Sequence, residues 1–96
     1  MTETIKVEMT VTLRFFASVR EQLGMAEQAV VLPPELTTVG QVRDWLSGRG
    51  AQWATALAHD KPLRMAYQQL MCEPSTLLVR ADAHQEIAFF PPVTGG

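Results

Sequence analysis

The sequence predicts an α+β domain in which a mixed sheet of about five short strands has helices packed on one face. The chain has 96 residues, which leaves room for one small domain. Its residues are 47% hydrophobic and 19% charged, as in globular proteins and unlike disordered chains. About five segments have strand patterns and only two or three have helical ones. Runs of strands with few helices in so short a chain are typical of α+β folds.

The first strand is expected from Ile5 to Phe15, where apolar and polar residues alternate strictly. This period of two places the apolar side chains on one face, which the core would bury. A short helix follows from Ala17 to Leu23, with Ser18 near its N-cap and Gly24 as its C-terminal stop.

A second strand is expected from Gln28 to Leu32, ended by the prolines at 33 and 34. The next helix begins at Thr38, which can form a capping box with Gln41. Three of its residues form one apolar stripe: Val39, Val42 and Leu46. Glycines 48 and 50 end this helix.

Another short helix is expected over Ala51–Ala58, followed by a turn at His59–Pro62. Trp45 and Trp53 lie on helix faces and are expected in or near the core. A further turn is expected at Asp82–Gln85. The remaining segments predict three strands, at Met65–Met71, Thr76–Arg80 and Glu86–Phe90.

Composition excludes several classes of function. The net charge of −2 and the lack of a basic cluster argue against a nucleic-acid partner. No stretch is long and apolar enough to span a bilayer, and the first residues do not resemble a secretory signal, so we expect no membrane association and a cytoplasmic location. The single cysteine, Cys72, forms no internal disulfide and is expected to be a half-buried, inert thiol.

No set of side chains predicts catalysis or metal binding. His59 and His84 are widely separated and each lies in a polar turn, so both are expected to be surface residues. The acidic residues are scattered, and the common nucleotide-binding and nucleophile motifs are absent from the sequence. We therefore expect no metal site and no activity of the chain by itself.

The C-terminal segment Pro91–Gly96 is the most informative part of the sequence. Proline cannot donate to a sheet ladder, so Pro91 and Pro92 should end the last strand and favour an extended tail. At roughly 3.3 Å per residue, six residues would reach about 20 Å, far enough to enter a partner's active site. Gly95 and Gly96 could pass through a narrow channel. We expect the α-carboxylate of Gly96 to be the working group.

The strand before the tail places Ile87 and Phe89 on one face and Ala88 and Phe90 on the other. One phenylalanine would then enter the core and the other would contact a partner at the base of the tail. Alternation alone does not decide between Phe89 and Phe90.

A terminal carboxylate is ionised at neutral pH and becomes reactive only when activated. Its attack on the α-phosphate of ATP would give an acyl-adenylate with pyrophosphate leaving. A sulfur nucleophile could then displace AMP to give a thiocarboxylate, or an amine could give an amide. Neither route requires catalytic side chains on the carrier.

Two segments carry a resemblance to a known family: FFASVREQLG at 15–24 and EIAFFPPVTGG at 86–96. They resemble the small, sulfur-carrier subunits of molybdopterin synthase. The resemblance implies a ubiquitin-like β-grasp domain over residues 1–90 and a tail over residues 91–96. The chain departs from the family in its turn before the last strand, at Asp82–Glu86, which leaves the tail unaffected.

The resemblance also implies a reaction. An activating enzyme would use ATP to adenylate Gly96, and a desulfurase or rhodanese-type donor would supply the sulfur of a thiocarboxylate. The tail residues, Pro91, Pro92, Val93, Thr94 and Gly95, would insert into the large synthase subunit of a heterotetramer. There the sulfur would pass to cyclic pyranopterin monophosphate to form the molybdopterin dithiolene. The chain itself would bind no cofactor.

Three alternatives use the same fold. A carrier for thiamine or cysteine synthesis would share the Gly-Gly ending but not the Phe-Phe-Pro-Pro run. A ubiquitin-like modifier would join Gly96 to lysines of target proteins. An interaction module with an incidental tail would keep its function after removal of Gly95 and Gly96.

Overall fold

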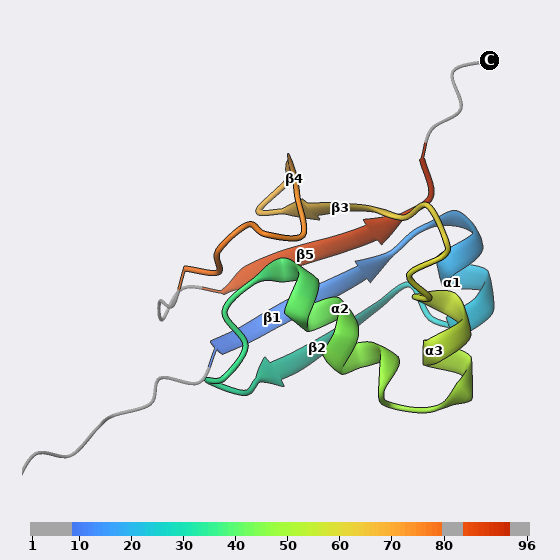
Figure 1. The fold of residues 1–96 in the computed structure, drawn as a ribbon, viewed down its shortest axis with the longest axis horizontal. Helices are drawn as coiled ribbons and strands as arrows, with labels where there is room; N and C mark the ends of the chain where they lie inside the picture. Colours follow the sequence, from blue (N-terminus) through green and yellow to red (C-terminus); the bar gives the residue numbers. More distant parts are fainter. Residues whose placement is uncertain (1–8, 80–83, 93–96) are drawn as a thin grey trace, which may run out of the picture.

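The structure is a computed structural model, and it describes residues 9–79 and 84–92. Five strands form one sheet in the order β2-β1-β5-β3-β4 (Figure 1). The elements along the chain are β1 (Met9–Phe15), α1 (Ala17–Leu23), β2 (Glu27–Leu32), α2 (Val39–Ser47), α3 (Ala51–Ala56), β3 (Arg64–Tyr67), β4 (Leu70–Cys72) and β5 (Gln85–Phe90).

The sheet is mixed, with β5 at its centre. β1 pairs parallel with β5 and antiparallel with β2. On its other side β5 pairs antiparallel with β3, which in turn pairs antiparallel with β4. The predicted α+β class is confirmed, because a sheet of five strands is covered by helices.

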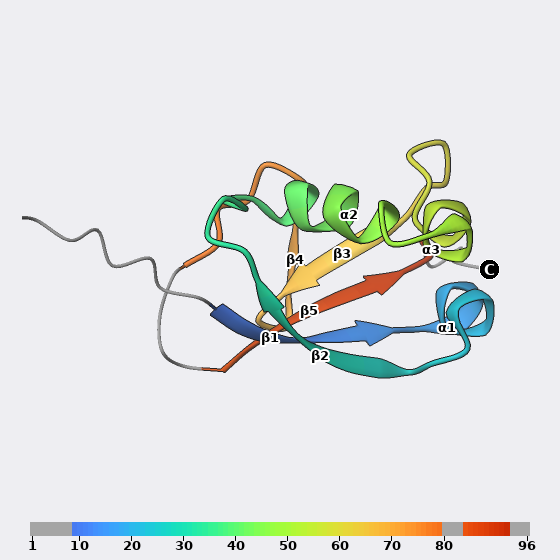
Figure 2. The same cartoon turned by 90° about the horizontal axis from the view of Figure 1, so that it is seen from below.

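One face of the sheet is the core face. The predicted alternation of β1 is confirmed: Met9, Val11, Leu13 and Phe15 are buried, while the residues between them retain exposed surface. The expected strand residues 5–8 lie outside the described part of the chain. Figure 2 shows α2 and α3 on one side of the sheet and α1 beside the end of β1.

The second helix begins and packs as its sequence predicts. Thr38 and Gln41 form the expected capping box, in which the backbone N–H of Gln41 donates to the Thr38 hydroxyl at 3.1 Å. The apolar stripe of α2 is completely buried: Val39, Val42 and Leu46. Trp45 and Trp53 are partly buried against this core, also as predicted.

The first helix has the predicted bounds but a different start. Its N-cap residue is Phe16 and no side chain caps it, so the expectation for Ser18 was wrong. Gly24 ends the helix in the left-handed conformation, at φ 72°, which glycine adopts at low cost.

The predicted strand Met65–Met71 is in fact a hairpin. β3 ends at Tyr67 and β4 begins at Leu70, and the two residues between them, Gln68 and Gln69, have φ values of 54° and 67°. Two consecutive positive φ values are typical of a tight two-residue hairpin turn. Glycine or asparagine usually marks such a turn, and neither is present here.

The predicted strand at Thr76–Arg80 was also wrong for its described residues. This segment instead runs along the start of α2, where Leu77 forms one isolated bridge with Thr38. The backbone N–H of Leu78 donates to the Thr37 carbonyl at 2.8 Å, and that of Val39 donates to the Thr76 carbonyl at 3.0 Å. These contacts replace a strand ladder.

A buried polar network holds the end of this segment. The Val79 N–H donates to the Tyr67 hydroxyl at 2.9 Å, and the Gln85 amide donates to the Val79 carbonyl at 2.8 Å. The Tyr67 hydroxyl donates to the Gln85 amide oxygen. Because Tyr67 and Gln85 are both buried, each polar atom needs such a partner.

The third helix ends at Ala56, two residues earlier than expected, and the following turn is held by a buried arginine. The Arg43 guanidinium donates to the carbonyls of Leu57, Ala58 and Lys61. Burial lowers the pKa of Arg43, and the nearby Asp44 carboxylate partly offsets this. None of the helices in residues 9–79 and 84–92 is long and apolar enough to cross a membrane.

Candidate functional site

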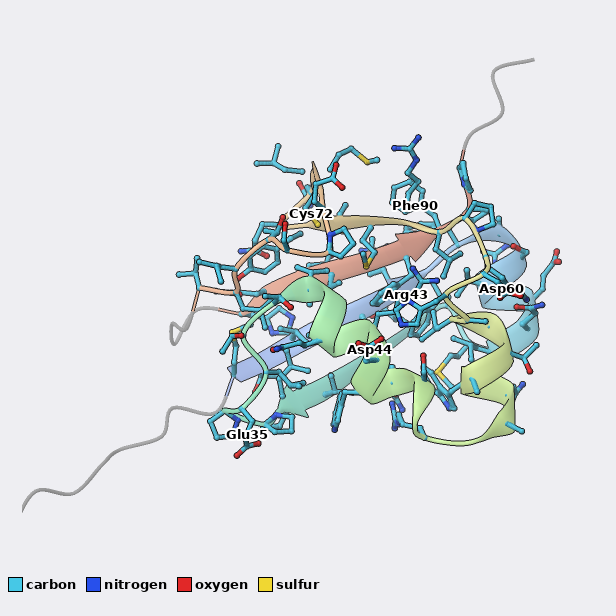
Figure 3. All side chains as sticks on the ribbon, viewed as in Figure 1. Glu35, Arg43, Asp44, Asp60, Cys72 and Phe90 are labelled. Atoms are coloured by element: carbon cyan, nitrogen blue, oxygen red, sulfur yellow. The ribbon has the colours of Figure 1, made fainter. Side chains whose placement is uncertain are left out.

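The candidate site is the end of β5, where the chain leaves the sheet. β5 ends at Phe90 as predicted, and Pro91 and Pro92 follow outside the ladder. Figure 3 shows Phe90 at this end of the strand, at the base of the tail. Residues 93–96 lie outside the described part of the chain, so the expectations for Val93, Thr94, Gly95 and Gly96 remain predictions.

The structure assigns the two phenylalanines to different faces. Phe89 is completely buried and its ring stacks on Phe15 with the centroids 6.1 Å apart. Phe90 lies on the face away from the helices and keeps part of its surface exposed. The sequence analysis named both residues as candidates for a partner interface. Only Phe90 is exposed enough to contact a partner, so the candidate Phe89 was wrong.

Phe90 belongs to an apolar surface on the outer face of the sheet. Its ring meets the Phe16 ring edge to face at a centroid distance of 6.4 Å. Ala88 of β5 pairs with Ala66 of β3, which pairs with Met71 of β4, so these three side chains share the outer face with Phe90. We call this set the outer patch: Phe16, Ala66, Met71, Ala88 and Phe90.

Two residues of the outer patch are exposed and the other three are partly exposed. Phe16 is 41% and Met71 60% exposed, and the small alanines lie between Met71 and Phe90. Contiguous exposed apolar surface is typical of a protein-interaction site. The sequence did not predict Phe16 or Met71 as site residues, because they come from segments far apart in the chain.

Two arginines lie beside the outer patch. The Arg14 guanidinium is centred 5.9 Å from the Phe16 ring and lies 3.3 Å from a Glu86 carboxylate oxygen. This pairing holds Arg14 against the ring through a cation–π contact. Arg64 is the direct ladder partner of Phe90.

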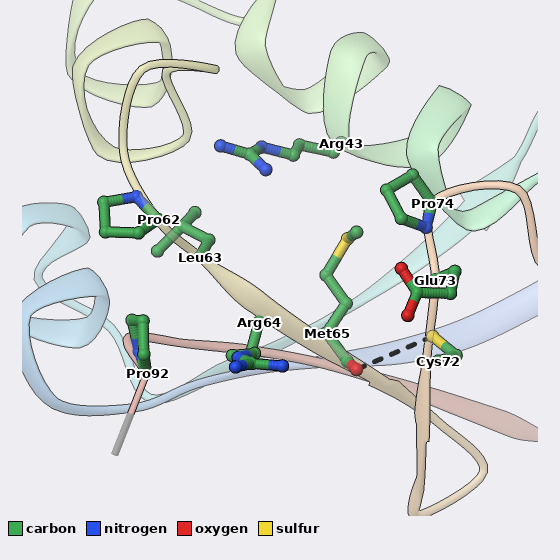
Figure 4. A pocket seen from close by; sticks show the side chains of 9 residues that line it. All are labelled: Arg43, Pro62, Leu63, Arg64, Met65, Cys72, Glu73, Pro74 and Pro92. Atoms are coloured by element: carbon green, nitrogen blue, oxygen red, sulfur yellow. Dashed lines mark hydrogen bonds between the residues drawn. The ribbon is translucent and has the colours of Figure 1, made fainter. Parts of the chain in front are cut away.

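A shallow pocket of about 310 Å³ lies next to the base of the tail (Figure 4). Pro92 lines it together with Arg43 of α2, Arg64 of β3 and Glu73, which follows β4. Cys72 also lines it, and its thiol donates a weak hydrogen bond to the Met65 carbonyl at 3.6 Å. Burial raises the pKa of the Cys72 thiol, which agrees with the predicted inert, half-buried cysteine.

The two histidines are exposed surface residues, as predicted. His59 forms a hydrogen bond with the exposed Asp44 carboxylate, and His84 forms one with the Thr12 hydroxyl. Across the described residues, no three His, Cys, Asp or Glu side chains gather in the manner of a metal site.

Comparison with known proteins supports the family resemblance that residues 15–24 and 86–96 indicate. The family model described as the ThiS family matches residues 13–96. The molybdopterin synthase sulfur carrier subunit of Haemophilus influenzae is 40% identical over 82 residues, which cover 85% of this chain and 94% of the relative. The protein of the same name from Escherichia coli is 38% identical over the same shares of both chains.

The fold has relatives among solved structures. The small archaeal modifier protein 1 of Haloferax volcanii superposes with a TM-score of 0.66 at 21% sequence identity, covering 88% of this chain and 99% of that one. This likeness concerns the fold, which is the ubiquitin-like β-grasp. The family match begins in β1 and extends through the Phe-Phe-Pro-Pro-Val-Thr-Gly-Gly ending. The chain therefore belongs to the ThiS family, among the sulfur carrier subunits of molybdopterin synthase.

Proposed function

We propose that this protein carries sulfur to molybdopterin synthase as a thiocarboxylate on Gly96. The Gly96 carboxylate attacks the α-phosphate of ATP in an activating enzyme, and pyrophosphate leaves. The persulfide of a desulfurase or rhodanese-type donor then displaces AMP to give an acyl disulfide. A second thiol attacks the donor's sulfur in this acyl disulfide, which forms a new disulfide and releases the thiocarboxylate. The family membership supports the sulfur-carrier role, and the Gly-Gly ending supports the chemistry.

The place where the tail begins is the observation that supports this proposal. The chain leaves the central strand of the sheet at Pro91, directly beside the exposed outer patch. A partner that binds the outer patch can therefore receive the tail in the same encounter. In this proposal apolar contacts hold the domain on the partner, and the tail enters the partner's active site.

The partner we propose for this face is the large subunit of molybdopterin synthase. Phe90 and Phe16 would anchor the contact, and Pro91 to Gly95 would carry Gly96 to cyclic pyranopterin monophosphate. Sulfur transfer to this substrate forms the dithiolene of molybdopterin. The catalytic side chains belong to the large subunit in this proposal, and the small chain is inactive by itself.

The remaining parts of the proposal concern the assembly. Two small subunits join a dimer of large ones in a heterotetramer, and the protein acts in the cytoplasm. It holds no cofactor of its own, because ATP is used in the activating enzyme. Residues 1–90 act as the recognised domain and residues 91–96 as the reactive tail.

The test is an intact mass after incubation with ATP, the activating enzyme and a sulfur source. Replacement of one oxygen of the ionised terminal carboxylate by sulfur adds about 16 Da. A variant that lacks Gly96 serves as the control and should show no stable gain of this size and no sulfur transfer. Full molybdopterin production by the truncated variant would contradict the proposal, and so would amide-linked conjugates to lysines as the main product.

A further inference from the structure

Arg64 lies at the base of the tail, and its guanidinium has no partner among the described residues. It is the first residue of β3 and pairs with Phe90 across the β3–β5 ladder, so the two side chains lie on the same face. Arg64 is exposed. Within residues 9–79 and 84–92, no carboxylate lies in ion-pair range of its guanidinium and no acceptor takes a hydrogen bond from it.

Three other arginines provide a contrast, because each has partners within its own domain. Arg14 pairs with Glu86, and Arg43 donates to three backbone carbonyls. Arg49 donates to Gln28 at 2.8 Å and lies 4.5 Å from the Trp53 ring centroid. Among the described residues, these three guanidiniums have partners, while those of Arg20 and Arg64 have none, and of these two only Arg64 lines the pocket beside Pro92.

The surroundings of Arg64 place it beside the point where the tail begins. In Figure 4 it lies between Pro92 and Cys72, and all three line the same pocket. Glu73 also lines this pocket but does not form an ion pair with Arg64. The nearest carboxylate on the outer face of β5, that of Glu86, is already paired with Arg14.

We propose that the protein that receives the tail presents a carboxylate to Arg64, and that this ion pair orients the docked domain. The inference rests on the proposed function, because it takes the large synthase subunit as that partner. Apolar contacts at the outer patch give affinity with little directional preference. A guanidinium–carboxylate pair is directional and often bidentate, so it would fix the rotation at which the tail enters.

The charge also bears on the rate of encounter. Charges at the rim of an interface act mainly on the association rate and on its salt dependence. With a net charge of −2, the whole chain has little attraction for an acidic surface. A local cation at the tail base would steer that end of the molecule toward the acidic site of the partner.

The experiment compares the full chain with its Arg64→Glu variant in binding to the purified large subunit at low and high salt. We expect Arg64→Glu to bind roughly tenfold more weakly at low salt, mainly through slower association. We also expect its affinity to depend less on salt than that of the natural chain. Arg64→Lys, which keeps the charge and loses the bidentate geometry, should fall between the two.

Arg49→Glu is the matched control, because it makes the same change of charge on the helix side of the sheet. It should bind the large subunit like the natural chain, and thermal melting should show that both variants are folded. If Arg64→Glu and the natural chain bind with equal affinity and equal salt dependence, the proposed ion pair is wrong. Lack of any binding by the natural chain would instead count against the proposed function, and with it this inference.

Discussion

At the scale of single residues, Gly40 shows how one missing Cβ shapes the fold. Gly40 lies in the first turn of α2, and its N–H donates to the Pro74 carbonyl at 2.8 Å. A Cβ at this position would lie 2.9 Å from the same oxygen, closer than real Cβ atoms approach a backbone atom. The absence of a side chain therefore lets the segment after β4 approach the helix.

We predict that Gly40→Ala destabilises the protein although alanine favours helices. To relieve the clash, Pro74 must move away, which weakens the adjoining hydrogen bonds at a cost of about 1–3 kcal/mol. We expect this cost to exceed the gain of about 0.5–1 kcal/mol that alanine brings over glycine inside a helix. Urea unfolding measures this difference. Gly48→Ala is the control, because its Cβ would meet nothing closer than 3.5 Å at a φ of −80°, and it should not lower the stability.

At the scale of elements, β5 has one buried face and one partly exposed face. Phe89 packs among core residues, while Phe90 contacts Phe16 at the surface. We predict that Phe89→Ala lowers the free energy of unfolding by about 3–5 kcal/mol. Phe90→Ala should cost much less stability and should weaken binding to the large subunit. Denaturant unfolding and binding titrations on both variants measure the two effects; equal losses of stability would contradict this assignment.

The elements also show what could be read from the sequence. β1 and the start of α2 were predictable because alternation and a capping box involve residues close in the chain. The Gln68–Gln69 turn was missed, since neither residue is a usual former of left-handed turns. The stretch before β5 read as a strand by its composition, but Tyr67 and Gln85 bind it through side chains instead.

The candidate site was likewise predictable only in part. Local pattern predicted that β5 ends before Pro91 and that Phe89 and Phe90 lie on opposite faces of the strand. The outer patch did not, because Phe16, Met71 and Phe90 come together only when β5 pairs between β1 and β3. The sequence did not predict a role for Arg64, because only the folded structure shows which charged side chains lack a partner.

At the scale of the whole molecule, α2 and α3 cover one face of the sheet and leave the other face open (Figure 2). Leu70 and Met71 are adjacent on β4 and both are well exposed, at 72% and 60%. Only Met71 shares the outer face with Ala66, because successive side chains of a strand point to opposite sides.

We predict that Met71→Ala weakens binding to the large subunit about fivefold to tenfold, as loss of an exposed apolar contact of about 1 kcal/mol would. Leu70→Ala removes a side chain of similar size from the other face and should leave the affinity unchanged. Calorimetric titration of both variants is the measurement. An equal effect of the two substitutions would show that the outer patch does not define the contact.

The central place of β5 also has a mechanical consequence. A pull on the tail, as when a partner grips it or releases it, is transmitted along β5 toward Gln85. Because β5 is hydrogen-bonded to β1 on one side and β3 on the other, that force acts on both ladders in shear, across many bonds at once. A strand at the edge would share the load with one neighbour only. A strand pulled from this end is therefore held by two ladders, which is what a domain needs if its tail is to be inserted and withdrawn as proposed.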